Sequence, residues 1–153
     1  MPIKKIISGG QTGVDRAALD IAIELGIPHG GFCPVGRRAE DGMIPSKYNL
    51  IENDSIKYAG RTLENVLSSD GTLILYKGLI SSGTALTKEF CIQKCKPIIM
   101  INILDDLNLS RLNFNRWVKG NSIQSLNVAG PRESEGAIYN VTENVLRHLL
   151  CIE

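Results

Sequence analysis

The stretch SGGQTGVDRAALD, residues 8–20, predicts the turn between a strand and a helix, the unit from which α/β folds are built. Before it, the apolar run in KKIIS, residues 4–8, is expected to form a short buried strand. After it, apolar residues recur with helical spacing and predict a helix over residues 14–25, which Gly26 and Pro28 would end. The apolar arc is wider than one stripe, so we expect the helix to be covered on more than one side, by neighbouring helices or by another subunit. The arc comprises Val14, Ala17, Ala18, Leu19, Ile21, Ala22, Ile23 and Leu25.

Similar units follow along the chain. Alternating strands and helices predict an α/β protein with a Rossmann-like, doubly wound, mainly parallel sheet flanked by helices, in a single domain over residues 1–153. The further strands are expected at 30–34 (weak), 71–76, 97–103 and 125–130, and a loop or flap at 34–54. Helices are expected at 61–68, after the strand at 71–76 with an end near 94, and at 109–119. PRESEG, residues 131–136, is expected to open a last helix, whose apolar stripe comprises Ile138, Val141, Val145, Leu149 and Ile152.

Composition limits the classes of function. The chain has 153 residues, 43% of them apolar, and a net charge of +1, so its bulk charge does not favour a nucleic-acid partner. It contains no run of about 18 apolar residues, and its start, MPIKKIISGG, has too short an apolar stretch for a signal peptide. We therefore expect a cytoplasmic protein without a membrane partner.

Cysteine and histidine spacing does not indicate a metal centre. The four cysteines are Cys33, Cys91, Cys95 and Cys151, and the two histidines lie in distant segments. We expect reduced, partly buried thiols and no metal ligated by the protein.

Three glycine-containing turns are expected at one edge of the sheet. In open parallel sheets, ligands bind outside the carboxyl ends of the strands, where SGGQTGVDR, GLISSGTALT and AGPRESEG fall. The spacing matches neither a P-loop nor a dinucleotide fingerprint. Glycines allow close backbone approach, and helix N-termini attract anions, so these turns predict a pocket for a phosphate with something attached. The candidate ligand-binding residues of the first two turns are Gly9, Gly10, Gln11, Thr12, Gly13, Ser82, Gly83 and Thr84.

Two charged residues follow the first turn. Asp15 falls among the apolar residues of its helix, so its carboxylate would need a partner, either Arg16 or a ligand N–H or hydroxyl group. The ordinary alternative is an acid favoured by the helix dipole. Arg16 lies on the polar arc and is either a site residue or an exposed arginine.

Two further charged pairs are candidate ligand contacts. Arg37 and Arg38 stand between glycines in the long loop, and an arginine there could clamp an anion bidentately or belong to a solvated charge run. Arg132 and Glu133 follow Gly130 in the third turn and are either site residues or an ion pair at a helix start.

Five blocks together resemble one family. ISGGQTGVDRAALD, HGGFCPVGRRAEDGMIP, RTLENV with SDGTLIL, SSGTALT and LNVAGPRES are similar, in this order, to the putative molybdenum carrier family of the Rossmann-like nucleotide-sensor group, related to Lonely Guy and lysine-decarboxylase-like proteins. The resemblance implies a Rossmann-like fold, a homo-oligomer (dimer or tetramer) and a phosphorylated heterocycle as ligand. It also implies the molybdenum cofactor as cargo, a pterin that brings its own metal.

One departure bears on enzymatic activity. Lonely Guy-type phosphoribohydrolases carry a P-G-G-x-G-T-x-x-E block, whereas this chain has SSGTALTKE, in which Glu89 lies two residues too far from Thr84. We therefore favour a carrier or sensor for the molybdenum cofactor or a related nucleotide-like molecule. One alternative is a hydrolase or transferase acting on a nucleotide phosphate or glycosidic bond, with Asp15 or Glu133 as the acid or base and Arg16 or Arg132 holding the phosphate. The other alternative is an oligomeric scaffold.

Overall fold

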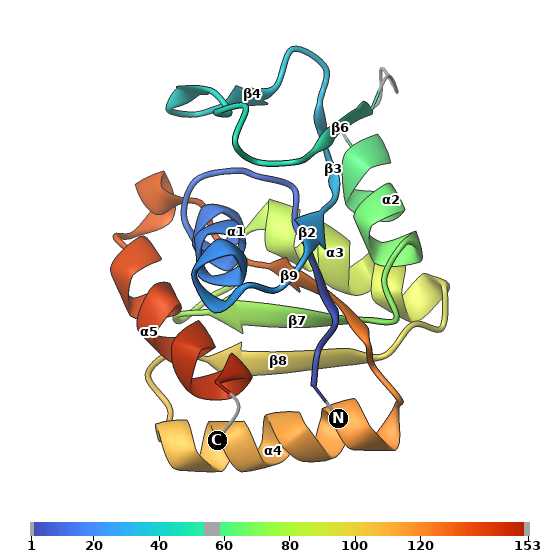
Figure 1. Cartoon of the computed structure of the whole chain (residues 1–153), viewed down its shortest axis with the longest axis vertical. Coiled ribbons are helices and arrows are strands. Elements are labelled where there is room, and N and C mark those ends of the chain that lie inside the picture. The colour runs from blue at the N-terminus through green and yellow to red at the C-terminus, as the bar shows by residue number, and fades with distance from the viewer. Residues whose placement is uncertain (1, 54–58, 152–153) are drawn as a thin grey trace.

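The fold is an α/β sandwich around one parallel sheet. A computed structural model describes residues 2–53 and 59–151 (Figure 1). Its central sheet has five strands in the order β2-β1-β9-β7-β8, and every pairing in it is parallel. The Rossmann-like prediction is thus confirmed. The strands are β1 (Lys5–Ile7), β2 (His29–Gly30), β7 (Gly71–Tyr76), β8 (Ile98–Asn102) and β9 (Ser125–Ala129).

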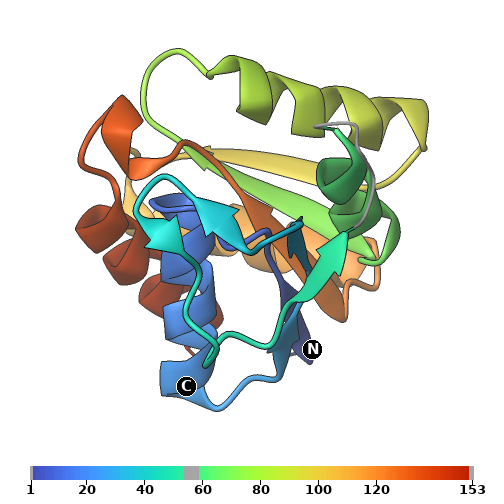
Figure 2. The same ribbon diagram turned by 90° about the horizontal axis from the view of Figure 1, so that it is seen from above.

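Helices cover both faces of the sheet. Figure 2 shows α3 on one side of the strands and α1, α4 and α5 on the other. The sheet and its covering helices share one large buried cluster, which includes Ile6, Leu73, Leu75, Leu126 and Val128 from the strands. The helices are α1 (Val14–Leu25), α2 (Gly60–Leu67), α3 (Ser82–Gln93), α4 (Leu107–Gly120) and α5 (Tyr139–Leu150).

Helix α1 has the predicted limits and the predicted double coverage. Gly26 ends it in the left-handed conformation, φ 70°, where its N–H reaches the carbonyls of the last turn. Ala18 and Ile21 belong to the main core with α5 and the sheet, whereas Leu19 lies in a second buried cluster with Cys33, Ile44, Tyr48 and Leu50. A neighbouring helix and the long loop therefore cover it, and Ile23 stays 46% exposed.

The long segment after residue 34 is folded. Two short pieces of it form an antiparallel hairpin, β4 (Arg38–Ala39) with β5 (Gly42–Met43). At its base, β3 (Phe32–Pro34) and β6 (Ile51–Asn53) make a separate two-stranded parallel sheet. The segment lies over the N-terminal end of α1, at the top of Figure 1, and its Ile44, Tyr48 and Leu50 are buried.

The last helix begins later than expected. PRESEG forms a separate 3₁₀ turn, η1 (Glu133–Glu135), and Gly136, at φ 137°, separates it from α5. The prediction that this block opens the final helix was therefore wrong. Of its predicted stripe, Val145 and Leu149 are buried, Val141 is 41% exposed, and Ile152 lies outside the described residues.

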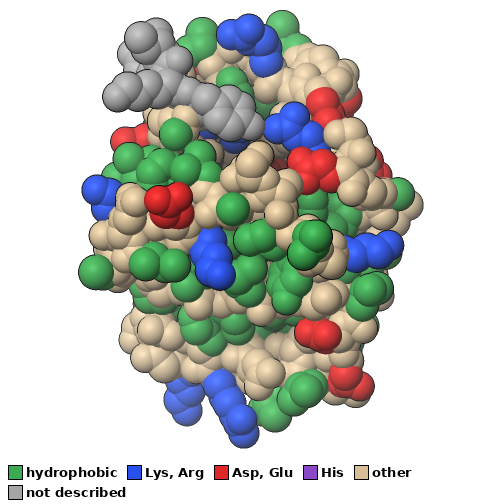
Figure 3. All heavy atoms as spheres, turned by 180° about the vertical axis from the view of Figure 1, so that it is seen from behind, with side chains coloured by type: hydrophobic (Ala, Val, Ile, Leu, Met, Phe, Trp, Pro, Cys, Tyr) green, Lys and Arg blue, Asp and Glu red, His purple; other side chains and the backbone are tan. Residues whose placement is uncertain are grey.

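Apolar side chains also reach the surface. Leu79 is 99% exposed, Leu104 68% and Ile92 62%. Figure 3 shows hydrophobic side chains gathered across the middle of the face opposite to that of Figure 1. No helix in the described ranges combines the length and the apolar character that crossing a membrane requires.

Candidate functional site

The three glycine-containing turns meet in one cavity at the carboxyl edge of the sheet. Its volume is about 340 Å³, within the range of small-molecule sites. The first turn, the second turn with α3, the end of β9 with the third turn, and α2 all contribute to its wall. The lining residues are Gly9, Gln11, Asp15, Arg61, Thr62, Asn65, Ser81, Ser82, Gly83, Thr84, Thr87, Asn127, Val128, Ala129, Gly130, Arg132, Ser134 and Glu135.

The glycines of the first turn have three different surroundings. Gly9 faces the cavity, and a methyl group there would lie 3.0 Å from Arg61 Nη1 and 3.1 Å from Asp15 Oδ2. At Gly10, φ 79°, a methyl group would meet Leu50 of the long loop at 2.6 Å. One at Gly13 would stand 2.4 Å from the carbonyl oxygen of Pro131. Of these three glycines, only Gly9 borders the cavity, and the other two are packed against the loop and the third turn.

Three backbone N–H groups at and before the start of α1 have acceptors within the protein. The N–H of Gly10 donates to Ser8 Oγ at 3.3 Å, and that of Thr12 to Gln11 Oε1 at 3.0 Å. Val14 N–H donates to the carbonyl of Pro131 at 3.2 Å, which ties the first turn to the third. These amides hold the turns together, so they are not available to an anion in the cavity.

The N-terminal end of α3 lies at the cavity wall. Ser81 is its N-cap, and its Oγ accepts the N–H of Thr84 at 3.5 Å. Ser82 and Gly83 occupy the first turn, where helix geometry provides no intrahelical acceptor for the N–H groups. A methyl group built on Gly83 would meet nothing within 4 Å. Helix N-termini attract anions through such N–H groups and the helix dipole, and this helix N-terminus lies at the cavity wall.

Asp15 is a carboxyl group in the cavity wall, half-buried in the first turn of α1. Burial raises its pKa to about 6, although Arg61, a backbone hydrogen bond with Gln11, Arg16 and Arg132 each favour the charged form. Arg16 was one of the partners expected for this carboxylate, beside a ligand N–H or hydroxyl group. The arginine with the largest electrostatic effect on the Asp15 pKa is instead Arg61, from α2.

Arg61, Thr62 and Asn65 were not anticipated from the sequence. All three come from α2. Asn65 is 4% exposed and pairs with the backbone of β3. The Asn65 Oδ1 accepts the N–H of Phe32 at 2.8 Å, and the Asn65 Nδ2 donates to the carbonyl oxygen of Phe32 at 3.0 Å. Asn127 of β9 was also missed, and its Nδ2 donates to Thr72 Oγ1 at 3.2 Å. The sequence signal that could have indicated Asn127 is its position as a polar residue in the middle of an apolar strand.

Several predicted candidates lie beside a second, more open hollow of about 700 Å³. Thr12, Gly13, Arg16 and Glu133 line it. Arg16 is 9% exposed, so the ordinary expectation of an exposed arginine was wrong. Glu133 Oε1 accepts the N–H groups of Ile138 and Tyr139 at 2.8 Å each, which caps the start of α5.

Arg37 and Arg38 lie outside the cavity. Arg37 has φ 54°, and its guanidinium donates to four carbonyl oxygens of its own loop, at 2.8 to 3.3 Å. They belong to Ile44, Pro45, Tyr48 and Leu50. Arg38 is exposed and donates to Val35 O at 3.2 Å. Arg37 therefore shapes the loop from within.

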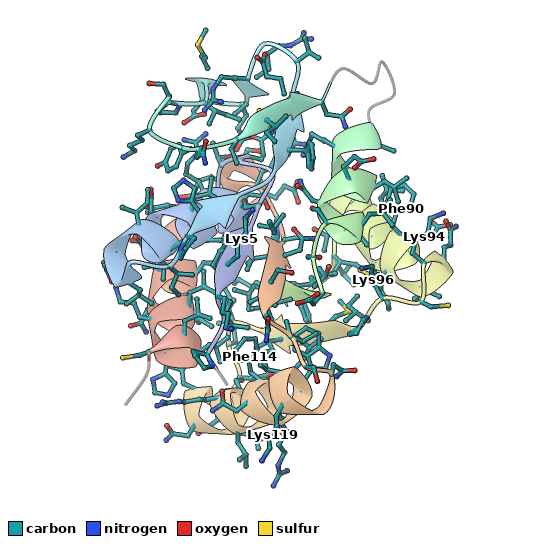
Figure 4. All side chains as sticks on the ribbon, turned by 45° about the vertical axis from the view of Figure 1, so that its right-hand side comes forward. Lys5, Phe90, Lys94, Lys96, Phe114 and Lys119 are labelled. Atoms are coloured by element: carbon teal, nitrogen blue, oxygen red, sulfur yellow. The ribbon has the colours of Figure 1, made fainter. Side chains whose placement is uncertain are left out.

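Two further features concern chemistry. Within residues 2–53 and 59–151, no three His, Cys, Asp or Glu side chains are grouped so that they could hold a metal ion. Glu89 is not among the residues that line the cavity; it is exposed on α3 and accepts from Gln93 at 3.1 Å. In Figure 4 the labelled Phe90 and Lys94 of the same helix lie on its side away from α1.

Comparison with known proteins identifies clear relatives. The profile of the circularly permutated YpsA SLOG family matches residues 6–150. Among solved structures, a crystal structure of a "putative molybdenum carrier protein" from Syntrophus aciditrophicus SB is 46% identical, with a TM-score of 0.93, and the match covers 97% of this chain and 96% of that one. No curated protein sequence matches the chain. The resemblance inferred from the five sequence blocks is thus confirmed.

Proposed function

Because this chain belongs to the circularly permutated YpsA SLOG family, we propose that it is a cytoplasmic binding protein, a carrier or sensor, for a phosphorylated heterocyclic ligand. The ligand would occupy the 340 Å³ cavity at the carboxyl edge of the sheet. Its proposed contacts among the predicted residues are Gly9, Gln11, Asp15, Ser82, Gly83, Thr84 and Arg132, joined by Arg61 from α2.

The observation that carries this proposal is the start of α3. Ser82 and Gly83 line the cavity and lie in the first turn of α3, where N–H groups have no intrahelical acceptor. In the first glycine-containing turn, the N–H groups of Gly10, Thr12 and Val14 are bonded within the protein. Arg61 and Arg132 add positive charge to the same cavity. A phosphate at α3 would receive charge-assisted hydrogen bonds, which are stronger than bonds between neutral groups.

The proposed cargo is the molybdenum cofactor. The similar crystal structure bears the name of a molybdenum carrier, and a pterin with a phosphate has the two parts that the cavity can receive, an anion and a polar ring. The metal would arrive within the cofactor, so the protein need not supply metal ligands. Mass spectrometry of gently purified protein should detect a bound pterin, whereas a bound nucleotide without pterin would redirect the proposal to a nucleotide sensor.

The anion site has a sharp test in Ser82, the first residue of α3. Ser82→Pro removes one N–H at a helix position that tolerates proline, and the preceding Ser81 is already extended, at φ −73° and ψ 170°. Ser82→Ala is the matched control, because it removes only the hydroxyl group. Calorimetry with ribose 5-phosphate should show that proline weakens binding roughly tenfold more than alanine does. Equal affinities of the two variants would contradict a phosphate at α3.

A second candidate function is turnover of the bound nucleotide, and one observation favours it. The carboxyl group of Asp15, with its pKa near 6, is suited to acid–base chemistry near neutral pH. Incubating nucleoside monophosphates with the protein and separating the products by chromatography would reveal hydrolysis. Product formation that Asp15→Asn abolishes would establish the enzyme, whereas intact nucleotides after long incubation would leave binding as the function.

We further propose that the protein works as a homo-oligomer, a dimer or a tetramer. The exposed Ile92 and Leu104, 62% and 68% accessible, and the apolar surface seen in Figure 3 favour association. Light scattering coupled to size-exclusion chromatography would measure the mass, and a monomer of 16.7 kDa would contradict this part of the proposal.

A further inference from the structure

The cavity wall contains groups of two opposite kinds. The start of α3, Arg61 and Arg132 attract negative charge, whereas Asp15 repels it when ionised. The other acidic residue of the wall, Glu135, is paired with Arg132, whose Nε lies 3.4 Å from its Oε1. The phosphate and Asp15 must therefore face different parts of one ligand, and the part that meets Asp15 must be uncharged.

Asp15 can accept more hydrogen bonds than the protein gives it. A carboxylate has two oxygens and about four acceptor sites. The backbone of Gln11 supplies one hydrogen bond, and the charged groups that act on Asp15 are Arg61 from α2, Arg132 from the third turn and Arg16 from its own helix. A carboxylate with spare acceptor sites in a cavity wall selects a ligand with N–H donors.

The shape of the wall favours recognition of a ring by its edge. Small residues, including Gly9, Gly83, Ala129 and Gly130, form much of it, and none of its lining residues in the described part of the chain is aromatic. Among the described residues, a ring in this cavity would therefore find no aromatic side chain to stack on. Its hydrogen-bonding edge can then supply the discrimination, and the Asp15 carboxylate in the wall can accept hydrogen bonds from N–H groups on that edge.

We propose that Asp15 selects heterocycles carrying a ring N–H next to an exocyclic amine, the donor pair of a 2-amino-4-oxopyrimidine ring. Two parallel N–H donors match the two oxygens of one carboxylate, whereas the corresponding edge of adenine places an acceptor opposite it. Guanine nucleotides and phosphorylated pterins share this donor pair. The inference rests on the proposed function, because the phosphate at α3 brings the ring into the cavity.

The test compares small molecules that each carry one phosphate but differ in the hydrogen-bonding edge of the ring. Calorimetry at pH 7.5 would measure GMP, which has both donors, IMP, which lacks the amine, AMP, which lacks the pair, and ribose 5-phosphate, which lacks the ring. We expect affinity to fall in that order, with roughly ten- to a hundredfold between GMP and AMP. Dihydroneopterin monophosphate in the same assay distinguishes the sources: tighter binding than GMP identifies the pterin, and weaker binding the guanine nucleotide.

Variants of Asp15 complete the test. Asp15→Asn keeps the size of the side chain but can accept only one of the two donors, so it should weaken GMP binding at least about tenfold. Binding of ribose 5-phosphate should not weaken, because the variant removes only a negative charge from the wall. Exposed Asp105→Asn is the control for the change of charge. Binding of GMP should also weaken as the pH falls below about 6, where Asp15 takes up a proton.

The outcomes distinguish a failure of this inference from a failure of the proposed function on which it rests. If GMP and AMP bind equally well, or if Asp15→Asn leaves GMP binding intact, the inference is overturned while a phosphate-binding protein remains. If ribose 5-phosphate, the nucleotides and the pterin phosphate all fail to bind the folded protein, the proposed function fails with it. Circular dichroism of each variant establishes that the protein is folded.

Discussion

Arg16 of α1 holds Asp41 of the β4–β5 hairpin with two parallel hydrogen bonds, Nη1 to Oδ2 at 2.9 Å and Nη2 to Oδ1 at 3.1 Å. The same guanidinium donates from Nε to the carbonyl of Gly10 at 3.1 Å. One buried arginine therefore joins the first turn to the hairpin. The side chain of Asp41 is 48% exposed, so water screens the pair in part.

Removing this carboxylate should loosen the hairpin. Asp41→Asn leaves the Arg16 side chain, only 11% exposed, without its charged partner. We expect the free energy of unfolding to fall by about 1 kcal/mol, since the Asp41 side of the pair is half exposed and screened by water. Urea denaturation of the variant beside Asp105→Asn, which changes an exposed aspartate between β8 and α4, would measure this. A midpoint shift shared by both variants would count against a specific role for the pair.

Glu40 makes stability sensitive to acid. Its carboxylate accepts from Ser134 Oγ at 2.6 Å, from Ser134 N–H at 3.0 Å and from the hydroxyl of Thr12. Hydrogen bonds from Ser134 and Thr12 hold the pKa of Glu40 below its ordinary value. Because the folded pKa is depressed, this stabilisation is present above the unfolded value, about 4.3, and is lost as the pH falls through the folded value.

Replacing Glu40 should therefore flatten the acid side of the stability profile. Glu40→Gln keeps the shape of the side chain but no longer changes charge between pH 5 and 3. Melting temperatures of the variant and the parent protein should lie furthest apart above pH 5 and converge toward pH 3. A constant difference in melting temperature between the two proteins from pH 5 to pH 3 would contradict a depressed pKa of Glu40.

Asp15 should cost stability in the protein without ligand. Its folded pKa, about 6, lies above the unfolded value of about 3.9, so the folded state binds the proton more tightly. The cost is absent well below pH 4, grows between the two values and is complete above pH 6. Asp15→Asn should then raise the unfolding free energy by about 1–3 kcal/mol at pH 7.5 and much less at pH 4. Denaturant titrations at the two pH values test this, and a destabilised variant at pH 7.5 would refute it.

Gly13 and Gly83 should respond in opposite ways to alanine. At Gly13, φ 79°, the added methyl group would lie 2.4 Å from Pro131 O, so we expect a loss of about 2–4 kcal/mol of stability. Gly83 lies within α3 with open space around it, so alanine there should leave stability unchanged or raise it by up to ~1 kcal/mol. Thermal unfolding of the two variants side by side makes the comparison. Similar losses at both positions would show that glycine is needed for another reason.

The elements with regular periodicity could be predicted closely. Helix α1 has its predicted limits because its apolar spacing and Gly26 indicate both the element and its end. Strand β7 also has the predicted limits, since GTLILY is a continuous apolar run. The hairpin could not be foreseen, because strands of two residues show no alternation, and it is held by side chains such as Arg37 that bond to backbone carbonyls.

For the candidate site, the sequence predicted the location in the fold better than the contacts between its residues. The convergence of three turns follows from parallel strands, whose carboxyl ends share one edge. Which atoms each glycine approaches is a tertiary property, so the different surroundings of Gly9, Gly10 and Gly13 could not be read from their spacing. Arg61 was missed for the same reason: it reaches Asp15 only because α2 packs beside the first turn.

Strand β9, near the end of the chain, occupies the middle of the sheet, paired with β1 on one side and β7 on the other. During synthesis, β1 with β2 and β7 with β8 would leave the ribosome as two separate ribbons that share no ladder. Residues 125–129 join them, so the sheet closes only after nearly the whole polypeptide has been made. A transcript truncated before codon 125 would encode two unjoined strand pairs with exposed edges, which are prone to aggregation.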